Sequence, residues 1–322
     1  MSATRFSRRA FGSLATLSLL GSAAPALAAA PRGPLPAAKG ALLPFATAPF
    51  PYRGTRPDGG AFFDVNDGDG RLGHTSPRGG VYYESSTYSD NRVLVALPAG
   101  FDLHRRAAIV VFLHGNNATL ERDVLSRQRV LKQLQASSLN AALIAPQFAV
   151  DALDSSAGRF WVPGAFAQFI SEAASALATL WGARTARSAF AELPIIVVGY
   201  SGGYNPAAYA TTVGGIARRI HGLILLDALV GEENRFLAWI TASHRWAFFF
   251  SAYSAATEDG NEGLTQKLAA RGIRYSTGLP QALLPGEVNI VAAPGAHDDY
   301  VTSAWVADPL TWLFDRIPGF SR

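Results

Sequence analysis

The sequence predicts a single α/β domain built around a mostly parallel sheet of about eight strands, flanked by helices. The chain has 322 residues, of which 49% are hydrophobic and 16% are charged, a composition typical of globular proteins. Short apolar runs rich in β-branched residues and Phe alternate with longer segments of helical composition. No cysteine is present, so disulfides, thiol nucleophiles and thiolate metal sites are excluded.

The predicted elements follow one another at regular intervals. An antiparallel pair, Gly80 to Tyr88 and Arg92 to Pro98, is expected to form the first edge of the sheet. Further strands are predicted at 108–113, 141–146, 194–199, 223–226, 246–251 and 288–293. Helices are predicted at 118–136, 163–181, 201–219, 232–240, 261–271 and 300–314. Only about 19 residues separate Asp227 from Trp246, which leaves room for one short helix and no large cap domain.

The N-terminal residues have the pattern of an export signal. Ser7-Arg8-Arg9-Ala10-Phe11 precedes an uncharged stretch, and Ala26-Leu27-Ala28 matches a small-x-small cleavage site. This pattern resembles a twin-arginine signal peptide, and it favours a periplasmic or secreted protein with the twin-arginine export machinery as a partner. A membrane anchor is less favoured because the apolar core is short and rich in Ala, Gly and Ser. We therefore expect a signal peptide at 1–28, an Ala/Pro-rich linker at 29–50 and one globular domain at 51–322.

The charge balance argues against nucleic acid as a partner. The 28 basic and 24 acidic residues give a formal net charge of +4, and three of the arginines belong to the predicted signal. No run of Lys and Arg appears in the body of the chain, so the footprint expected of a protein that binds a polyanion is absent.

One motif indicates a nucleophile. Gly199-Tyr200-Ser201-Gly202-Gly203 follows an apolar strand and opens a helical segment. This is the G-x-S-x-G pattern in a strand–turn–helix context, where a tight turn exposes the serine Oγ above the sheet. The alternative is a Gly-rich turn in which the serine only caps a helix. From about Gly80 to its end the chain resembles the α/β-hydrolase family.

The resemblance implies an oxyanion hole. His114-Gly115-Asn116-Asn117 follows the predicted strand 108–113 and is similar to the family's His-Gly loop. The backbone N–H groups of Gly202 and Asn116 are then expected to stabilise the charge of a tetrahedral intermediate, with Asn117 as a less favoured donor. We expect His114 to brace the loop by hydrogen bonds.

Six histidines are candidates for the base. Ligands of open α/β sheets bind beyond the carboxyl ends of strands, whereas His104, His221 and His244 precede their strands and His74 lies upstream of the alternating region. His297 follows the last predicted strand and comes after the serine, in the order Ser, acid, His that the family uses. His297 is therefore the predicted base.

The acid has three candidates. Asp227 comes directly after the apolar strand next to the elbow, whereas Glu258 and Asp259 follow the next strand, where the family usually has its acid. We prefer Asp227 because its carboxylate starts on a rigid element, and Glu258 and Asp259 stay open as alternatives. Asp298 and Asp299 are expected to cap the last helix.

Weaker patterns concern substrate and ions. Several aromatic and polar residues fall near strand ends or the elbow and are candidates to contact substrate: Gln147, Phe148, Phe160, Trp161, Tyr200, Tyr204 and Tyr253. The Asp64 to Asp69 stretch has displaced calcium-loop spacing and no bidentate Glu, so a hairpin turn is favoured there. No metal and no cofactor is predicted.

Together these patterns favour an exported serine hydrolase that cleaves a carboxylic ester through an acyl-enzyme on Ser201. The substrate is expected to be a small-molecule or polymer ester. An amidase or peptidase with the same three residues is the alternative enzyme, and a catalytically silent binding protein on the same fold is the alternative outside enzymes. The sequence does not predict the oligomeric state.

Overall fold

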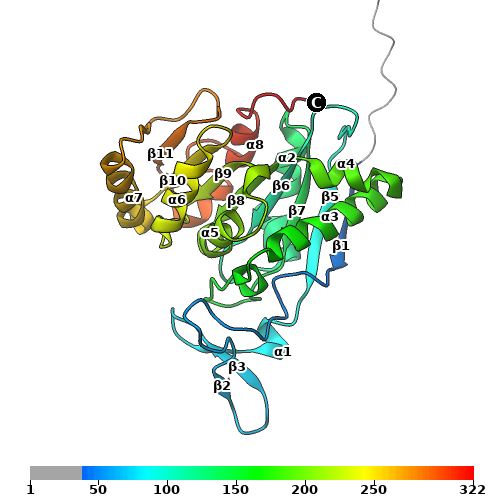
Figure 1. Cartoon of the computed structure of the whole chain (residues 1–322), viewed down its shortest axis with the longest axis vertical. Helices are drawn as coiled ribbons and strands as arrows, with labels where there is room; N and C mark the ends of the chain where they lie inside the picture. The colour runs from blue at the N-terminus through cyan, green and yellow to red at the C-terminus, as the bar shows by residue number, and fades with distance from the viewer. Residues whose placement is uncertain (1–37) are drawn as a thin grey trace, which may run out of the picture. The chain divides into compact units, whose positions relative to one another are not determined.

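A computed structural model describes residues 38–322, which form one compact unit. The predicted signal peptide and residues 29–37 of the predicted linker lie outside the described residues. The main sheet has eight strands in the order β1-β5-β7-β6-β8-β9-β10-β11 (Figure 1). Their bounds are β1 Lys39–Pro44, β5 Arg92–Leu97, β6 Ala108–Leu113, β7 Ala141–Pro146, β8 Ile195–Tyr200, β9 Ile220–Leu226, β10 Phe248–Tyr253 and β11 Val288–Ala292. Only β5 runs against its neighbours, so the prediction of a mostly parallel sheet is confirmed.

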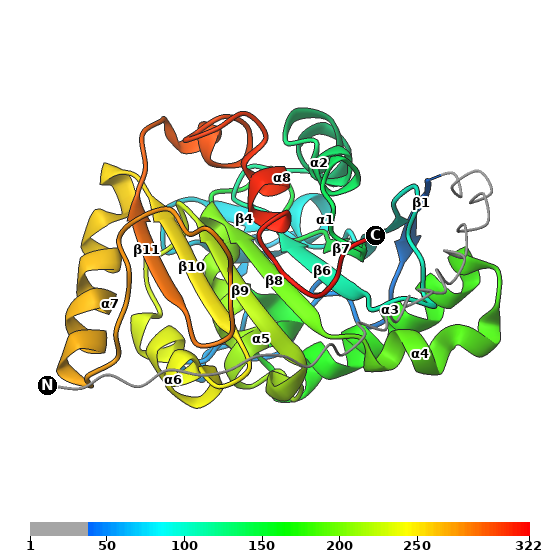
Figure 2. The ribbon, with the colours of Figure 1, turned by 90° about the horizontal axis from the view of Figure 1, so that it is seen from above.

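Helices cover both faces of this sheet, as Figure 2 shows from above. One face carries α3 Ala165–Trp181, α4 Arg187–Glu192, α5 Tyr204–Thr212, α6 Glu233–Ser243 and α7 Glu258–Ala270. The other face carries the π-helical segment Leu120–Arg127, α2 Val130–Ala136 and α8 Pro309–Phe314. Successive strand residues alternate between two hydrophobic cores, because side chains of a strand point to opposite faces. The strands are therefore buried on both sides, as parallel strands require.

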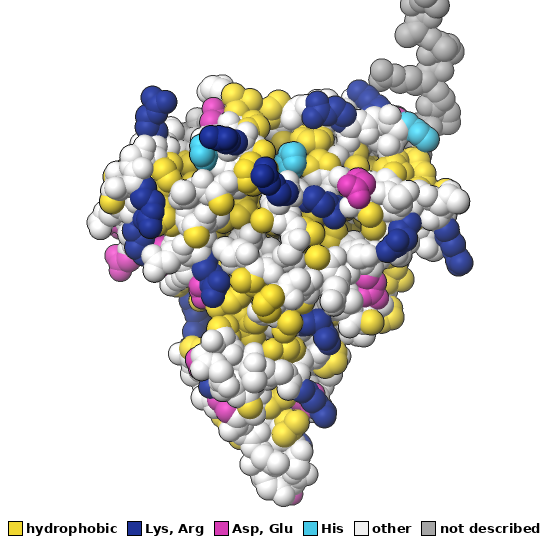
Figure 3. Space-filling model, viewed as in Figure 1, with side chains coloured by type: hydrophobic (Ala, Val, Ile, Leu, Met, Phe, Trp, Pro, Cys, Tyr) yellow, Lys and Arg dark blue, Asp and Glu magenta, His cyan; other side chains and the backbone are white. Residues whose placement is uncertain are grey.

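The connection between β9 and β10 holds α6 and no inserted domain, as predicted. Short 3-10 turns occur at Gly158–Trp161, Arg184–Ala186, Ser201–Gly203, Ala217–Arg219, Ala255–Thr257 and His297–Val301. Within residues 38–322, every helix is too short or too polar to cross a lipid bilayer. Figure 3 shows Lys and Arg side chains spread over the face drawn rather than gathered in one patch.

The first edge of the sheet differs from the prediction. β1 pairs with β5 in antiparallel register from Lys39 with Leu97 to Pro44 with Arg92, so the second half of the predicted 29–50 linker is part of the fold. The predicted hairpin of 80–88 with 92–98 is wrong, because Glu84–Thr87 forms the short helix α1 and β5 pairs with β1 and β7 instead. A proline-rich composition concealed β1, which tolerates Pro44 at its end because it is an edge strand.

Three predicted helices are shorter than expected. The 118–136 segment is divided at Arg129, whose φ of 52° is left-handed. The 201–219 helix ends at Thr212, and Gly215 shortly after it has a left-handed φ of 88°, which does not continue a helix. The 300–314 helix is confined to α8, because Pro309 disfavours helical geometry in the residue before it.

A second, three-stranded sheet lies between β1 and β5 in the sequence and below the main sheet in Figure 1. It contains β2 Val65–Asn66, β3 Leu72–Thr75 and β4 Val81–Tyr83, all antiparallel. The predicted hairpin at Asp64 to Asp69 is confirmed: Asp67 accepts backbone hydrogen bonds from Asp69 and Arg71 and pairs with the Arg71 guanidinium. In residues 38–322 no group of three or more His, Asp or Glu side chains has the geometry to hold a metal ion.

Candidate active site

The turn after β8 holds Ser201 in an unusual backbone conformation. Ser201 has a φ of 51°, in the left-handed region that non-glycine residues rarely adopt. A Cβ on Gly203 would lie 2.2 Å from the carbonyl oxygen of Leu113, so only glycine allows this turn to approach β6 so closely. Local strain of this kind is typical of functional positions. The elbow geometry expected from the sequence is present.

Ser201, His297 and Asp227 form one hydrogen-bonded chain. His297 Nε2 lies 2.8 Å from Ser201 Oγ, and His297 Nδ1 lies 2.6 Å from Asp227 Oδ2. With Nδ1 protonated, the imidazole donates to the carboxylate and accepts the serine hydroxyl proton at Nε2. The three residues follow β8, β11 and β9, so the carboxyl edge of the sheet brings together residues that are up to 96 positions apart.

Asp227 is the acid that the structure places beside His297. Its side chain is fully buried, and it also accepts hydrogen bonds from the Ser254 backbone N–H at 2.8 Å and from Thr257 Oγ1 at 2.5 Å. Burial alone would raise the pKa of Asp227, but the hydrogen bonds from His297, Thr257 and Ser254 outweigh it and lower this pKa. The alternatives Glu258 and Asp259 are exposed in the first turn of α7.

Tyr200 and Asp298 hold the loop that carries His297. The Tyr200 ring stacks on the imidazole with centroids 5.1 Å apart, and its hydroxyl donates to Asp298 Oδ1 at 3.1 Å. Asp298 also pairs with Arg127 at 3.0 Å. Tyr200 is 3% exposed, so the expectation that it contacts substrate is corrected: it positions His297. Asp298 does not cap a helix as expected, whereas Asp299 caps the 3-10 turn by accepting from Ala296 N–H at 2.8 Å.

Three features decide the architecture. They are the strand order, the sharp turn after β8, and the carboxylate, imidazole and hydroxyl that meet at the carboxyl edge of the sheet. The chain has the α/β-hydrolase fold. No known protein-family model matches the sequence. No curated protein matches it either.

Among solved structures, the chain is similar to a feruloyl esterase module from Clostridium thermocellum, with 16% identity, a TM-score of 0.42 and coverage of 76% of this chain and 87% of that one. It is similar to an S-formylglutathione hydrolase from Agrobacterium tumefaciens at 12% identity and a TM-score of 0.45, covering 77% and 96%. It is also similar to an esterase from Pyrobaculum calidifontis, with 14% identity, a TM-score of 0.35 and coverage of 69% of this chain and 74% of that one. Similarity this low carries no argument about activity, so the fold assignment depends on the strand order and the elbow.

The loop after β6 lies directly against the nucleophile. A Cβ on Gly115 would lie 2.7 Å from Ser201 Cβ, and a Cβ on Gly202 would lie 2.2 Å from Asn116 Oδ1. Asn116 Oδ1 accepts a hydrogen bond from Ser155 Oγ at 3.1 Å. The two residues expected to supply the oxyanion hole therefore adjoin each other beside Ser201. Asn117, the less favoured donor, gives its N–H to the carbonyl of Ala152 at 2.9 Å.

His114 and Gln147 brace this loop from inside. His114 is buried; its Nδ1–H donates to the carbonyl of Gly115 at 2.7 Å, and its Nε2 accepts from the Phe148 N–H at 2.9 Å. Burial lowers the pKa of His114, which favours the neutral ring that this bonding needs. Gln147 is fully buried and accepts from the Leu120 N–H at 3.0 Å, so the expectation that it contacts substrate is wrong. Phe148 and Phe160 are also buried, so they belong to the hydrophobic core.

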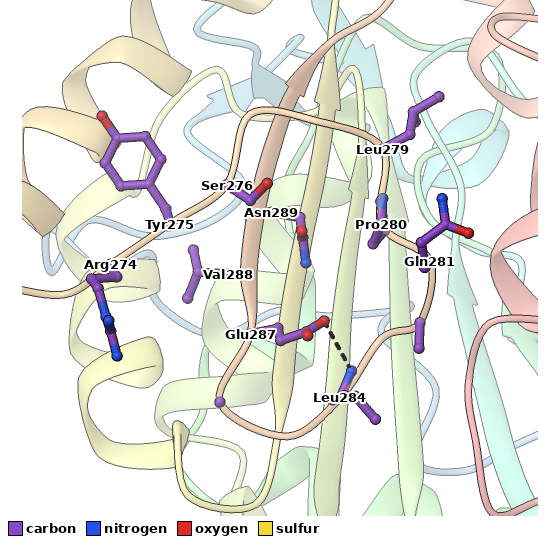
Figure 4. Close-up of a pocket in the computed structure, with 12 residues that line it drawn as sticks. Arg274, Tyr275, Ser276, Leu279, Pro280, Gln281, Leu284, Glu287, Val288 and Asn289 are labelled. Carbon is purple, nitrogen blue, oxygen red and sulfur yellow. Dashed lines mark hydrogen bonds between the residues drawn. The ribbon is translucent and has the colours of Figure 1, made fainter.

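One sizeable cavity is remote from this site. It has a volume of about 520 Å³ and lies where β11 begins, under a loop that includes Tyr275 and Leu284 (Figure 4). Because neighbouring strands are parallel to β11, this is the amino edge of the sheet, opposite Ser201. Two smaller cavities, of about 110 and 410 Å³, lie near the elbow instead, and Trp161 lines both. Tyr204 lines the smaller one.

Proposed function

We propose that this protein is a serine hydrolase that cleaves carboxylic esters through an acyl-enzyme on Ser201. The observation that supports the proposal is the hydrogen-bonded chain from Ser201 Oγ through His297 to the buried Asp227, on a turn with left-handed backbone at the serine. A serine hydroxyl becomes nucleophilic through an adjacent base, and His297 occupies that position beside Ser201.

In the proposed reaction, His297 Nε2 removes the Ser201 proton as Oγ attacks the ester carbonyl. The negative charge that develops on the carbonyl oxygen is stabilised by the N–H groups of Gly202 and Asn116. His297 then protonates the departing alcohol, and water attacks the acyl-enzyme by the same route to release the acid. The carboxylate of Asp227 keeps the proton on Nδ1 and stabilises the imidazolium that forms.

Labelling with a fluorophosphonate tests the proposal directly. Mass spectrometry is expected to find the label on Ser201 alone, and Ser201→Ala is expected to lose labelling together with hydrolysis of p-nitrophenyl acetate. The loss of turnover should be about 10⁵-fold or more. Ser89→Ala, which removes an exposed hydroxyl that donates to the backbone carbonyl of Ser85, is the matched control. Labelling that survives Ser201→Ala, or no labelling of the native protein, would refute the hydrolase.

Esters and amides are separated by a second comparison. A p-nitroanilide with the same acyl group presents the poorer leaving group, and the proposed esterase should hydrolyse it far more slowly than the p-nitrophenyl ester. Comparable kcat/KM values for the two substrates would favour an amidase or peptidase.

Export is a separate proposal, based on Ser7-Arg8-Arg9-Ala10-Phe11, which lies outside the described residues. We propose that the twin-arginine machinery carries the folded protein to the periplasm or the medium. Replacing Arg8 and Arg9 with Lys should keep the precursor inside the cell, as cell fractionation would measure. Unchanged export of that variant would refute this route.

A further inference from the structure

A groove leads away from the nucleophile between the small sheet and α5. It consists of two adjoining cavities of about 110 and 410 Å³, which share Pro77, Ser156, Trp161 and Asn205 in their walls. Ser155 lines its inner end, and Ser155 Oγ lies 2.8 Å from the position a Cβ on Gly202 would take. Ser155 therefore links the groove to Asn116 and Gly202 beside Ser201, and we expect one part of a substrate bound to Ser201 to reach it.

The apolar residues in the walls of the groove are three aromatic residues and two prolines, Pro57 and Pro77. Among residues 38–322, those that line the two cavities include no Ala, Val, Ile, Leu or Met. Binding a long alkyl chain requires apolar walls, because its binding free energy comes from the apolar area removed from water. This groove therefore does not suit the ester of a fatty acid or a fatty alcohol.

Aromatic rings and fixed polar groups take the place of aliphatic walls. Trp161, Tyr204 and Tyr209 line the groove, and the Trp161 indole N–H donates to Asn205 Oδ1 at 3.1 Å, which fixes both side chains. An aromatic face packs against the C–H groups of a sugar ring, while amide, carboxylate and hydroxyl groups exchange hydrogen bonds with its hydroxyls. The groove offers both kinds of contact side by side.

In the outer cavity the charged side chains of the groove have partners of opposite charge, whereas the inner cavity is lined by one cation, Arg78, and one anion, Asp154. Arg56 contacts Asp58 at 3.3 Å and Asp64 at 2.8 Å, and Glu232 contacts Arg235 at 2.9 Å. Side chains neutralised in this way still accept and donate hydrogen bonds, but they exert little net field on a ligand. An uncharged polar ligand therefore suits the groove better than an ion.

We propose that this groove binds the hydroxylated pyranose portion of the ester, so that the substrates are esters of saccharides. The inference depends on the proposed hydrolase function and specifies its substrate class. The sugar can stand on either side of the bond that is cleaved: as the alcohol that leaves, or as a uronic acid that forms the acyl-enzyme. Both place the same ring chemistry in the groove.

Four esters test this inference: 6-O-acetylcellobiose, the methyl ester of methyl glucuronoside, n-hexyl acetate and p-nitrophenyl acetate. The native enzyme is expected to have at least a tenfold higher kcat/KM for one of the sugar esters than for n-hexyl acetate. The first sugar ester reports a sugar on the alcohol side, and the second reports a sugar on the acyl side.

Variants then locate the effect. Trp161→Ala and Asn205→Leu should each lower the ratio of kcat/KM on the preferred sugar ester to kcat/KM on p-nitrophenyl acetate by at least tenfold. Tyr275→Ala removes an exposed aromatic ring from the remote cavity and should leave the ratio unchanged. If Trp161→Ala fails to fold, which its circular dichroism spectrum would reveal, Asn205→Leu on the surface of α5 decides the test.

The outcomes separate this inference from the proposed function. If the native protein hydrolyses p-nitrophenyl acetate but prefers n-hexyl acetate to both sugar esters, the groove assignment is wrong and the hydrolase stands. Equal ratios in the native enzyme and Asn205→Leu would overturn the assignment in the same way. If p-nitrophenyl acetate is not hydrolysed at all, the hydrolase itself is refuted.

Discussion

The proposed reacting centre, which consists of Ser201, His297 and Asp227, and the groove beside it are built in different ways. Ser201, Asp227 and His297 each follow the carboxyl end of a sheet strand, so their positions depend on regular backbone structure. The groove combines residues of α5 and β3 with irregular segments tied by side chains, such as the Tyr88 hydroxyl that donates to buried Asp154 across 66 positions at 2.9 Å. Local sequence patterns therefore predict the proposed chemistry, whereas the proposed selectivity depends on contacts that no local pattern contains.

After the loss of Ser201 itself, replacing the acid should have the largest effect at the reacting centre. Asp227→Asn keeps the size of the side chain but no longer fixes the proton on His297 Nδ1, so kcat on p-nitrophenyl acetate should fall about 10⁴-fold. The circular dichroism spectrum should stay that of the native enzyme. Asp259→Asn is the control, since this carboxylate is exposed at the start of α7. Near-normal turnover in Asp227→Asn would show that another acid serves His297.

Crowding the nucleophile should have the next largest effect. In Gly115→Ala the new methyl group would lie 2.7 Å from Ser201 Cβ, so Ser201 or the loop must shift. A displacement of this kind in a catalytic group costs about 10²-fold in kcat/KM. Gly263→Ala in α7 is the matched control, because a Cβ there meets nothing within 4 Å. That control should keep full activity and gain about 0.5–1 kcal/mol in unfolding free energy. Full activity in Gly115→Ala would show that the loop yields without cost.

The success of the sequence predictions follows the same division. β6 and β7 have the predicted bounds because uninterrupted apolar runs mark strands buried on both faces. His297 and Asp227 lie together beside Ser201, as predicted, because strand ends of a parallel sheet meet at one edge. β1 was missed because its composition resembles a linker, and Ser254 and Thr257 were missed because their role depends on the folded position of Asp227. Gln147 was misassigned because proximity to a strand end does not tell whether a side chain faces inward.

Removing a hydrogen bond beside the groove should lower the unfolding free energy without changing the reactivity of Ser201. Tyr88→Phe removes the hydrogen bond to Asp154, a carboxylate that is 4% exposed, and should lower the free energy of unfolding by about 1–3 kcal/mol. Urea denaturation would measure this loss. Tyr275→Phe, at an exposed ring, should change stability by less than about 0.5 kcal/mol. The rate of fluorophosphonate labelling at Ser201 should stay near the native value in both variants. A large fall in labelling of Tyr88→Phe would show that the two regions are coupled.

The smallest expected effect is a pH dependence of the unfolding free energy that comes from His114, in the loop beside Ser201. Burial lowers the pKa of His114 in the folded protein, whereas the unfolded chain has a pKa of about 6.5. As the pH falls below that value, the unfolded state binds a proton that the native state does not bind. The unfolding free energy should then fall by up to about 1.4 kcal/mol per pH unit until the folded pKa is reached. His114→Gln should be less stable at neutral pH but show a flatter pH profile, whereas His244→Gln, at an exposed ring, should keep the native profile. Parallel profiles for His114→Gln and the native protein would mean that His114 binds its proton equally well in both states, and that the loop beside Ser201 does not depend on a neutral imidazole.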